Sequence, residues 1–172
     1  MKTINNKNQC LVSFIIPCLN GINFIDRCFK SILAQTKDDW EIIVVDNGST
    51  DGSLSKLNEY SKNDKRIHVV SIDIRDLGTA RNTGIENANG KYLCFVDVDD
   101  YIENNLVDLV SKYESKDIFI FDYFKNKNGK KILRKMPFEI NNLEQNEINF
   151  ALEWVCGDIK SKSPFSIDLL ST

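Results

Sequence analysis

Short apolar runs alternate with segments of helical periodicity along the first part of this chain, and this alternation limits the folds that it can adopt. Four runs have the length and the β-branched content of buried strands: Val12 to Ile16, Glu41 to Val45, Ile67 to Ile72 and Tyr92 to Val96. Three segments between them carry the spacing or the start signals of helices: Ile22 to Gln35, Asp51 to Ser61 and Thr79 to Asn87. Strands with few polar positions need cover on both faces, which helical crossovers give to a parallel sheet. The sequence therefore predicts an α/β fold with a mostly parallel, Rossmann-like sheet.

The pattern loosens after Asp100. Four further elements are expected there: a helix over Leu106 to Glu114, a strand over Asp117 to Phe124, a hairpin turn at Asn126 to Gly129 with Lys131 to Lys135 as its returning strand, and a helix over Asn146 to Val155. The last segment, Cys156 to Thr172, has no clear periodicity.

Composition excludes several classes of protein. The chain has 172 residues, 42% of them hydrophobic, which suits one globular domain, and its formal net charge of -3 gives no support to a nucleic-acid partner. Its 5 cysteines are an odd number without C-x-x-C spacing, so neither a disulfide framework nor a zinc site is expected. No apolar run is long enough to span a bilayer, and the polar start of the chain is unlike a signal peptide. We therefore expect a cytoplasmic protein.

Polar clusters follow three of the expected strands directly: Pro17 to Asn20, Asp46 to Asp51 and Asp97 to Asp100. The carboxyl ends of parallel strands share one edge of a sheet, and open α/β folds bind ligands at that edge. We therefore expect the clusters to converge into one site. Taken alone, the second cluster could equally be an Asx-type turn followed by a helix cap.

The third cluster, Asp97-Val98-Asp99-Asp100, concentrates three carboxylates directly after an apolar run. Carboxylates this close repel one another, and a divalent cation that prefers oxygen ligands would relieve the repulsion. The cluster therefore predicts an Mg²⁺ or Mn²⁺ site. The alternative is a solvated acidic turn in which Asp100 caps the next helix.

The segment Gly78 to Gly84 is a candidate phosphate site. Arg81 falls at the start of an expected helix, on the side of the polar clusters, and helix amides with a guanidinium suit a phosphate group. An ordinary surface arginine is the alternative. Other sites are excluded, because no G-x-G-x-x-G follows the first strand, Gly90-Lys91 lacks P-loop spacing, and the single histidine, His68, is better explained as a core or edge residue.

Family-2 glycosyltransferases carry ordered signatures that four segments of this chain resemble: Val12 to Pro17, Val45 to Ser53, Ala80 to Gly84 and Phe95 to Asp100. The resemblance covers residues 11–125 and implies the glycosyltransferase A fold, a three-layer α/β/α sandwich that binds a nucleotide sugar. The family usually has a second acidic residue where this chain has Asn47, whereas Asp46 fits the pattern.

The resemblance implies roles for residues at the ends of the first two strands. Pro17 and Leu19 would line the nucleobase pocket, with Asn20 beside them, although an aromatic residue is common at the position of Leu19. Asp46 would accept a hydrogen bond from the base, typically uracil.

It also implies roles for the later segments. Arg81 would lie near the base or the diphosphate. Asp97, with Val98, would bind the ribose or a metal-bound water, and Asp99 would ligate the metal that bridges the diphosphate oxygens. The implied metal ligands are thus Asp99 and Asp97, while Asp100 is a possible contact of the donor sugar.

The activity implied by the resemblance is metal-dependent, inverting transfer of a hexosyl or N-acetylhexosaminyl group, with UDP-sugar as the expected donor and a glycan or lipid-linked molecule as acceptor. Such enzymes serve polysaccharide biosynthesis, so association with the inner face of the membrane is part of this expectation. The catalytic base stays unidentified, because none of the tail carboxylates Glu153, Asp158 and Asp168 sits in the family's context.

Three parts are expected along the chain: a polar tail at residues 1–10, a nucleotide-sugar-binding domain at 11–125 and an incomplete acceptor-side region at 126–172. Two alternatives stay open. One is a truncated or degenerate module that binds a nucleotide sugar without transferring it. The other is a nucleotidyltransferase, which usually has a Gly-rich, Arg-containing loop where this chain has Pro17 to Gly21.

Overall fold

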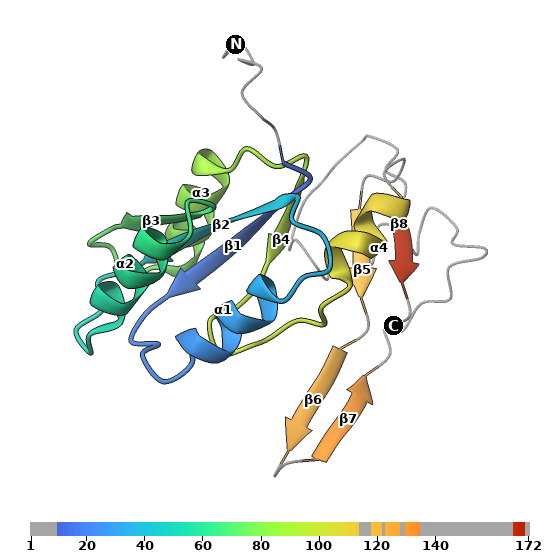
Figure 1. Cartoon of the computed structure of the whole chain (residues 1–172). Helices are drawn as coiled ribbons and strands as arrows, with labels where there is room; N and C mark the ends of the chain where they lie inside the picture. Colours follow the sequence, from blue (N-terminus) through green and yellow to red (C-terminus); the bar gives the residue numbers. More distant parts are fainter. Residues whose placement is uncertain (1–9, 114–117, 122, 128–129, 135–166, 171–172) are drawn as a thin grey trace. The chain divides into compact units, whose positions relative to one another are not determined.

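A computed structural model describes residues 10–113, 118–121, 123–127, 130–134 and 167–170 of the chain (Figure 1). The chain divides into two compact units, Met1–Ser111 and Lys112–Thr172. Each unit is described by itself.

The first unit is built on a parallel sheet of 4 strands in the order β3-β2-β1-β4. The strands are β1 (Val12–Cys18), β2 (Trp40–Asp46), β3 (Ile67–Ser71) and β4 (Tyr92–Phe95). Every residue of β1 and β2 is buried, as the nearly unbroken apolar runs predict for central strands. The predicted parallel sheet is confirmed.

Helices cover both faces of this sheet (Figure 1). They are α1 (Ile25–Leu33), α2 (Ser53–Asn63) and α3 (Leu77–Asn87), and α4 (Leu106–Lys112) follows the last strand of the sheet. The chain steps in one direction from β1 to β3 and back across the sheet to β4, so right-handed crossovers place α1 and α2 on one face and α3 on the other. The result is the predicted three-layer α/β/α sandwich.

Glycine allows helix α3 to lie directly on strand β1. A Cβ at Gly84 would stand 2.4 Å from Ile15 Cγ2, closer than non-bonded carbon atoms approach. The helix can therefore pack this closely only without a side chain at that position.

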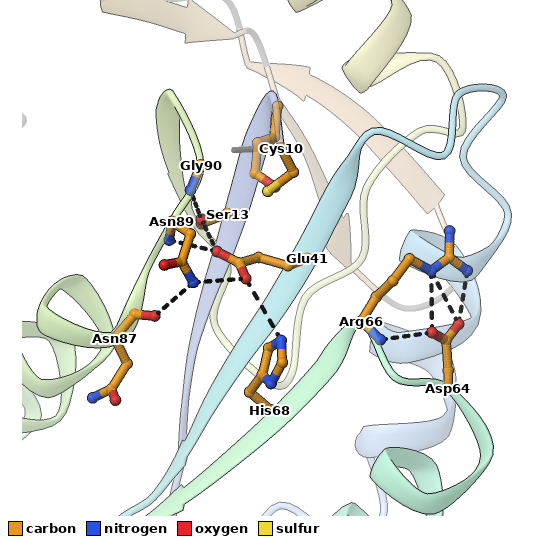
Figure 2. Close-up of polar contacts among 10 residues, drawn as sticks. Cys10, Ser13, Glu41, Asp64, Arg66, His68, Asn87, Asn89 and Gly90 are labelled. Carbon is orange, nitrogen blue, oxygen red and sulfur yellow. Dashed lines mark hydrogen bonds and ion pairs between the residues drawn. The ribbon is translucent and has the colours of Figure 1, made fainter. Parts of the chain in front are cut away.

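A polar network lies at the amino-terminal edge of the sheet (Figure 2). The Glu41 carboxylate is buried and accepts hydrogen bonds from Ser13 Oγ at 2.6 Å and from the backbone N–H of Asn89 at 2.6 Å. Ser13 Oγ in turn accepts from Gly90 N at 2.7 Å, and His68 Nε2 lies 3.6 Å from Glu41 Oε2. His68 is exposed on the edge strand β3, in agreement with its expected structural position.

Among the helix boundaries that differ from those expected, two bear on the candidate site. Helix α1 begins at Ile25 rather than Ile22, because residues 22–24 form a turn. Helix α3 begins at Leu77, two residues early, because the Asp76 carboxylate accepts a hydrogen bond from Thr79 N at 2.6 Å and caps the helix there. Arg81 therefore lies in the second turn of α3 and not at its start.

The second unit contains two small sheets. β5 (Ile118–Phe121) pairs in parallel with β8 (Ile167–Leu170), while β6 (Tyr123–Lys127) and β7 (Lys130–Arg134) form an antiparallel pair. The expected hairpin is confirmed.

One expectation for this second unit is wrong. The single strand expected over Asp117 to Phe124 is two strands in different sheets. Strand β8 lies in the segment without periodicity, since 4 residues are too few to show an alternation. The helix expected over Asn146 to Val155 lies outside the described residues.

Within the described part of the chain, no helix has the length and apolarity needed to cross a bilayer.

Candidate functional site

The strand register brings the three polar clusters to one edge of the sheet. Cys18 at the end of β1 lies opposite Asp46 at the end of β2, and β4 runs beside β1 in the same direction, with Phe95 opposite Ile15. Asp97 follows β4 at the same edge. The convergence expected from the sequence is therefore present.

Asn20 joins the first cluster to the second. Its backbone N–H donates to Ser49 Oγ at 2.9 Å, and its side-chain oxygen accepts from Thr50 N at 2.8 Å. These bonds need a left-handed backbone, and Asn20 has φ 54°, a conformation that asparagine tolerates better than most residues. The amide oxygen of this predicted donor-binding residue thus holds two loops together.

A second pair of bonds supports this connection. Ile22 N donates to Asp51 Oδ2 at 3.0 Å, while Asp51 Oδ1 accepts from Ser53 N at 2.9 Å at the start of α2. The Asx-type turn of the alternative explanation is therefore present, whereas the N-cap residue of α2, Gly52, makes no side-chain cap hydrogen bond. The turn shapes the loop without occupying Asp46.

Two buried oxygen atoms at the end of β2 have no hydrogen-bond partner among the residues that the structure describes. Asp46 accepts from Ser49 N at 3.3 Å through Oδ2, but its Oδ1 is buried and unpaired, and so is Asn47 Oδ1. Buried acceptors without a donor are costly and rare in folded proteins. A ligand that brings N–H or O–H groups to this edge would satisfy them.

The two residues expected beside these oxygens differ in exposure. Pro17 is buried within β1, opposite Val45, whereas the Leu19 side chain is 43% exposed. Leu19 thus offers apolar surface at the sheet edge. Pro17 is enclosed in the sheet, where it forms part of the end of strand β1.

The acidic cluster forms an exposed loop after β4. Asp97, Asp99 and Asp100 are all exposed, and Val98 is half-buried. Partial burial and the charges of Asp99 and Asp97 raise the pKa of Asp100, with Arg27 acting in the opposite direction. The repulsion predicted for three adjacent carboxylates is therefore present in the fold.

Two contacts fix this loop against the rest of the site. Asp97 Oδ1 accepts a hydrogen bond from Arg81 Nη2 at 3.0 Å, which ties the loop to helix α3. A Cβ at Gly21 would lie 2.9 Å from Val98 Cγ1, so the loop after β1 and the acidic loop touch through Val98. Arg81 Nε is buried and has no partner within the described part of the chain, which leaves the guanidinium a donor for a ligand.

The acidic residues suit a cation that is shared with a phosphate ligand. Among the described residues, no group of three His, Cys, Asp or Glu side chains could hold a metal ion. Mg²⁺, however, is commonly bound by one or two carboxylates together with substrate phosphates and waters. Asp97 and Asp99 match that donor set and do not match an all-protein metal cage.

The catalytic base is not identified. Glu153 and Asp158 lie outside the described residues, and Asp168 lies in β8, of which only the backbone is described. The sequence also gave no sign that the amide oxygen of Asn47 would be left unpaired, or that Arg27 faces the acidic loop. The hydrogen-bond partners of such side chains are residues distant in sequence, and the local sequence pattern does not identify them.

Known proteins share this architecture. The model of the family "Glycosyl transferase family 2" matches residues 13–164. Glycosyltransferase GlyA of Streptococcus pneumoniae is 38% identical over 117 residues, covering 66% of this chain and 17% of GlyA.

Solved structures agree with the sequence matches. S. aureus TarS 1-349, determined in complex with UDP, superposes with a TM-score of 0.64 at 26% identity, over 76% of this chain and 39% of TarS. GalNAc-T7, determined with UDP, GalNAc and Mn²⁺, superposes with a TM-score of 0.55 at 25% identity, over 69% of this chain and 24% of GalNAc-T7. The chain therefore spans only part of each of these proteins.

The family model covers most of the chain, from residue 13 to residue 164. The chain belongs to glycosyl transferase family 2.

Proposed function

We propose that this sheet edge binds the nucleoside diphosphate part of a UDP-sugar, and that the enzyme containing it transfers the sugar to a glycan or lipid-linked acceptor with inversion. The observation that carries the proposal is the pair of buried, unpaired acceptors, Asp46 Oδ1 and Asn47 Oδ1. The UDP complex of TarS supports the choice of nucleotide.

The unpaired oxygens favour uracil over cytosine. The N3–H of uracil is a donor flanked by two carbonyl acceptors, so it can satisfy Asp46 Oδ1 or Asn47 Oδ1. Cytosine has an acceptor at N3 and would place it against these oxygens. The exposed Leu19 would cover part of the base with apolar surface.

The diphosphate and the metal would lie toward α3 and the acidic loop. Arg81 Nε would donate to a phosphate oxygen, and its Nη2 already orients Asp97. Asp99 and Asp97 would hold Mg²⁺ or Mn²⁺ together with the phosphates. When bound, this cation would offset the negative charge of the diphosphate leaving group.

For the acceptor side we propose only the chemical class of the catalytic base and of the acceptor. A carboxylate base would take the proton of the acceptor hydroxyl, and none is assigned to a residue here. The roles of Asn20 and Val98 would be indirect, because Asn20 ties the loops together and Val98 packs against Gly21. Asp100 would face the donor sugar. A lipid-linked acceptor would bring the enzyme to the inner face of the membrane.

A thermal-shift screen of the full chain tests donor binding. UDP, UDP-glucose and UDP-GlcNAc should raise the melting temperature more than CDP or GDP, and Mn²⁺ should increase the shift. Asp99→Ala should abolish the Mn²⁺-dependent part, while Glu59→Ala, which removes an exposed carboxylate of α2, should not. Equal shifts with all nucleotides would contradict the base assignment, and an unchanged Mn²⁺ effect in Asp99→Ala would contradict the metal assignment.

A transfer assay separates the enzyme from a binding module. The chain covers a small share of its longer relatives, so binding without transfer is the second candidate. Metal-dependent UDP-sugar binding without hydrolysis or transfer would favour the module.

A further inference from the structure

One face of helix α1 and the turn after it holds the whole segment that follows β4. Arg27, Ser31 and Gln35 are spaced by four residues, so they project from the same side. Each contacts the main chain between Asp99 and Val107, about 70 residues away in sequence.

The contacts of Ser31 and Gln35 are hydrogen bonds to loop and helix backbone. Ser31 Oγ accepts from Ile102 N at 3.1 Å. Gln35 donates through Nε2 to the carbonyl of Glu103 at 2.7 Å, and its Oε1 accepts from Val107 N at 3.0 Å. These two residues therefore fix the far end of the segment, at the start of α4.

Arg27 fixes the near end, at the acidic residues themselves. Its Nη2 donates to the carbonyl oxygen of Asp99, and its guanidinium lies 5.3 Å from the ring centroid of Tyr101 and 6.0 Å from that of Phe24. The planar guanidinium thus lies within cation–π distance of two rings while it bonds a carbonyl. It also places a positive charge beside the carboxylates.

We propose that Arg27 is a positioning residue of the donor site, which fixes the peptide of Asp99 so that the carboxylate is ordered before the cation and the diphosphate bind. The inference rests on the proposed function for its consequence in binding, but the ordering itself is a property of the free protein. Nothing in the motif signatures includes residue 27.

Preorganisation explains why this bond matters. A loop that carries adjacent like charges spreads over many conformations unless its backbone is tied down, and ordering it on binding lowers affinity. Loss of a charge-assisted bond at an exposed site would weaken binding of UDP with Mn²⁺ by about three- to tenfold.

The first experiment needs no ligand. Amide hydrogen exchange measured by NMR on the full chain should show faster exchange at Asp100 and Ile102 in Arg27→Gln, with the amides of β1 and β2 unchanged. Lys30→Gln is the matched control, because it removes the same charge from an exposed position of α1. Arg27→Lys, which keeps the charge, should restore part of the protection. Equal exchange in Arg27→Gln and Lys30→Gln would overturn the proposal.

The second experiment measures UDP binding by calorimetry with and without Mn²⁺. Arg27→Gln should lose most of the affinity that Mn²⁺ adds and keep the affinity for UDP alone, whereas Lys30→Gln should match the wild type in both. A uniform loss with and without Mn²⁺ would overturn the positioning role. If Mn²⁺ adds nothing in the wild type, the proposed metal site fails, and the exchange experiment still decides whether Arg27 orders the loop.

Discussion

The Asp97 carboxylate accepts a hydrogen bond from Arg81 at 3.0 Å, so the acidic loop after β4 is tied to helix α3. Both side chains are more than one-third exposed, with 38% of Arg81 and 51% of Asp97 accessible. An ion pair this exposed contributes little to stability, about 0 to 1 kcal/mol. The main effect of the ion pair is therefore to position the Arg81 guanidinium and not to stabilise the fold.

Arg81→Gln should separate these two effects. The free energy of unfolding, measured with urea, should fall by less than about 1 kcal/mol, since the pair is exposed. The affinity for UDP without metal should fall by about tenfold or more, because a charge-assisted contact to the diphosphate is lost. Lys62→Gln removes a lysine from the last turn of α2 and should leave both quantities unchanged. UDP affinity that survives in Arg81→Gln would remove Arg81 from the donor site.

Substitution of Glu41 should have the opposite effect to Arg81→Gln: it should lower the stability of the fold and leave UDP binding unchanged. Its carboxylate is the buried acceptor for Ser13 Oγ and for Asn89 N at the amino-terminal edge of the sheet (Figure 2). Glu41→Ala leaves both donors unpaired, which should lower the free energy of unfolding by about 2 to 4 kcal/mol. Glu41→Gln keeps one acceptor oxygen and should lose less.

UDP binding by the Glu41 variant serves as the control for this prediction. The network stands at the end of the strands away from Asp46 and Asp97, so UDP affinity per folded molecule should stay at the wild-type value in Glu41→Gln. A Glu41→Ala protein as stable as the wild type, by urea unfolding, would show that water replaces the carboxylate without cost.

The close packing of α3 on β1 gives a prediction with an internal rescue. Gly84→Ala places a methyl group where Ile15 Cγ2 already stands, 2.4 Å away. Overpacking of this kind should lower the free energy of unfolding by about 1 to 3 kcal/mol. Ile15→Ala removes the obstructing atom, so in a double-mutant cycle the combined loss should be smaller than the sum of the single losses. Additive losses would mean that the helix moves instead.

The sequence predicted the sheet better than the site. Runs such as Glu41 to Val45 are apolar enough to specify a buried strand locally, and their alternation with helical segments predicts a parallel sheet. The predicted start of helix α3, Thr79, is two residues late, because the Asp76 side chain caps the helix ahead of it.

The contacts that shape the site could not be predicted in this way. Asn20 bonds Thr50, and Arg27 bonds the carbonyl of Asp99, across sequence separations that no local pattern encodes. The motif signatures predict donor-site roles for Asp46, Arg81 and the acidic cluster, which lie at the ends of strands and in the second turn of helix α3, because each falls within a short sequence signature. Supporting residues on the face of a helix carry no such signal.

The thiol of Cys28 links the helix α1 layer to the acidic loop and makes stability depend on alkaline pH. Cys28 is fully buried, and its Sγ lies 4.0 Å from the carbonyl oxygen of Asp97. Burial, reinforced by the charge of Asp100, raises the pKa of this thiol from 9.0 to about 12. The thiol therefore stays protonated in the folded protein over a range of pH in which the unfolded chain loses its proton.

The sign of the effect follows from this difference in pKa. Below pH 9.0 both states hold the proton, and the stability from burying a neutral thiol is fully present; above it the unfolded chain is favoured increasingly until pH reaches about 12. One such thiol steepens the loss of stability by about 1.4 kcal/mol per pH unit. Urea unfolding of the wild type, Cys28→Ala and Cys28→Ser from pH 8 to about 10.5 checks this. In both variants the free energy of unfolding should fall less steeply above pH 9.0, because neither alanine nor serine ionises in this range. Cys28→Ala should also lower the free energy of unfolding at every pH. Parallel profiles for all three proteins would show that another group carries the alkaline dependence.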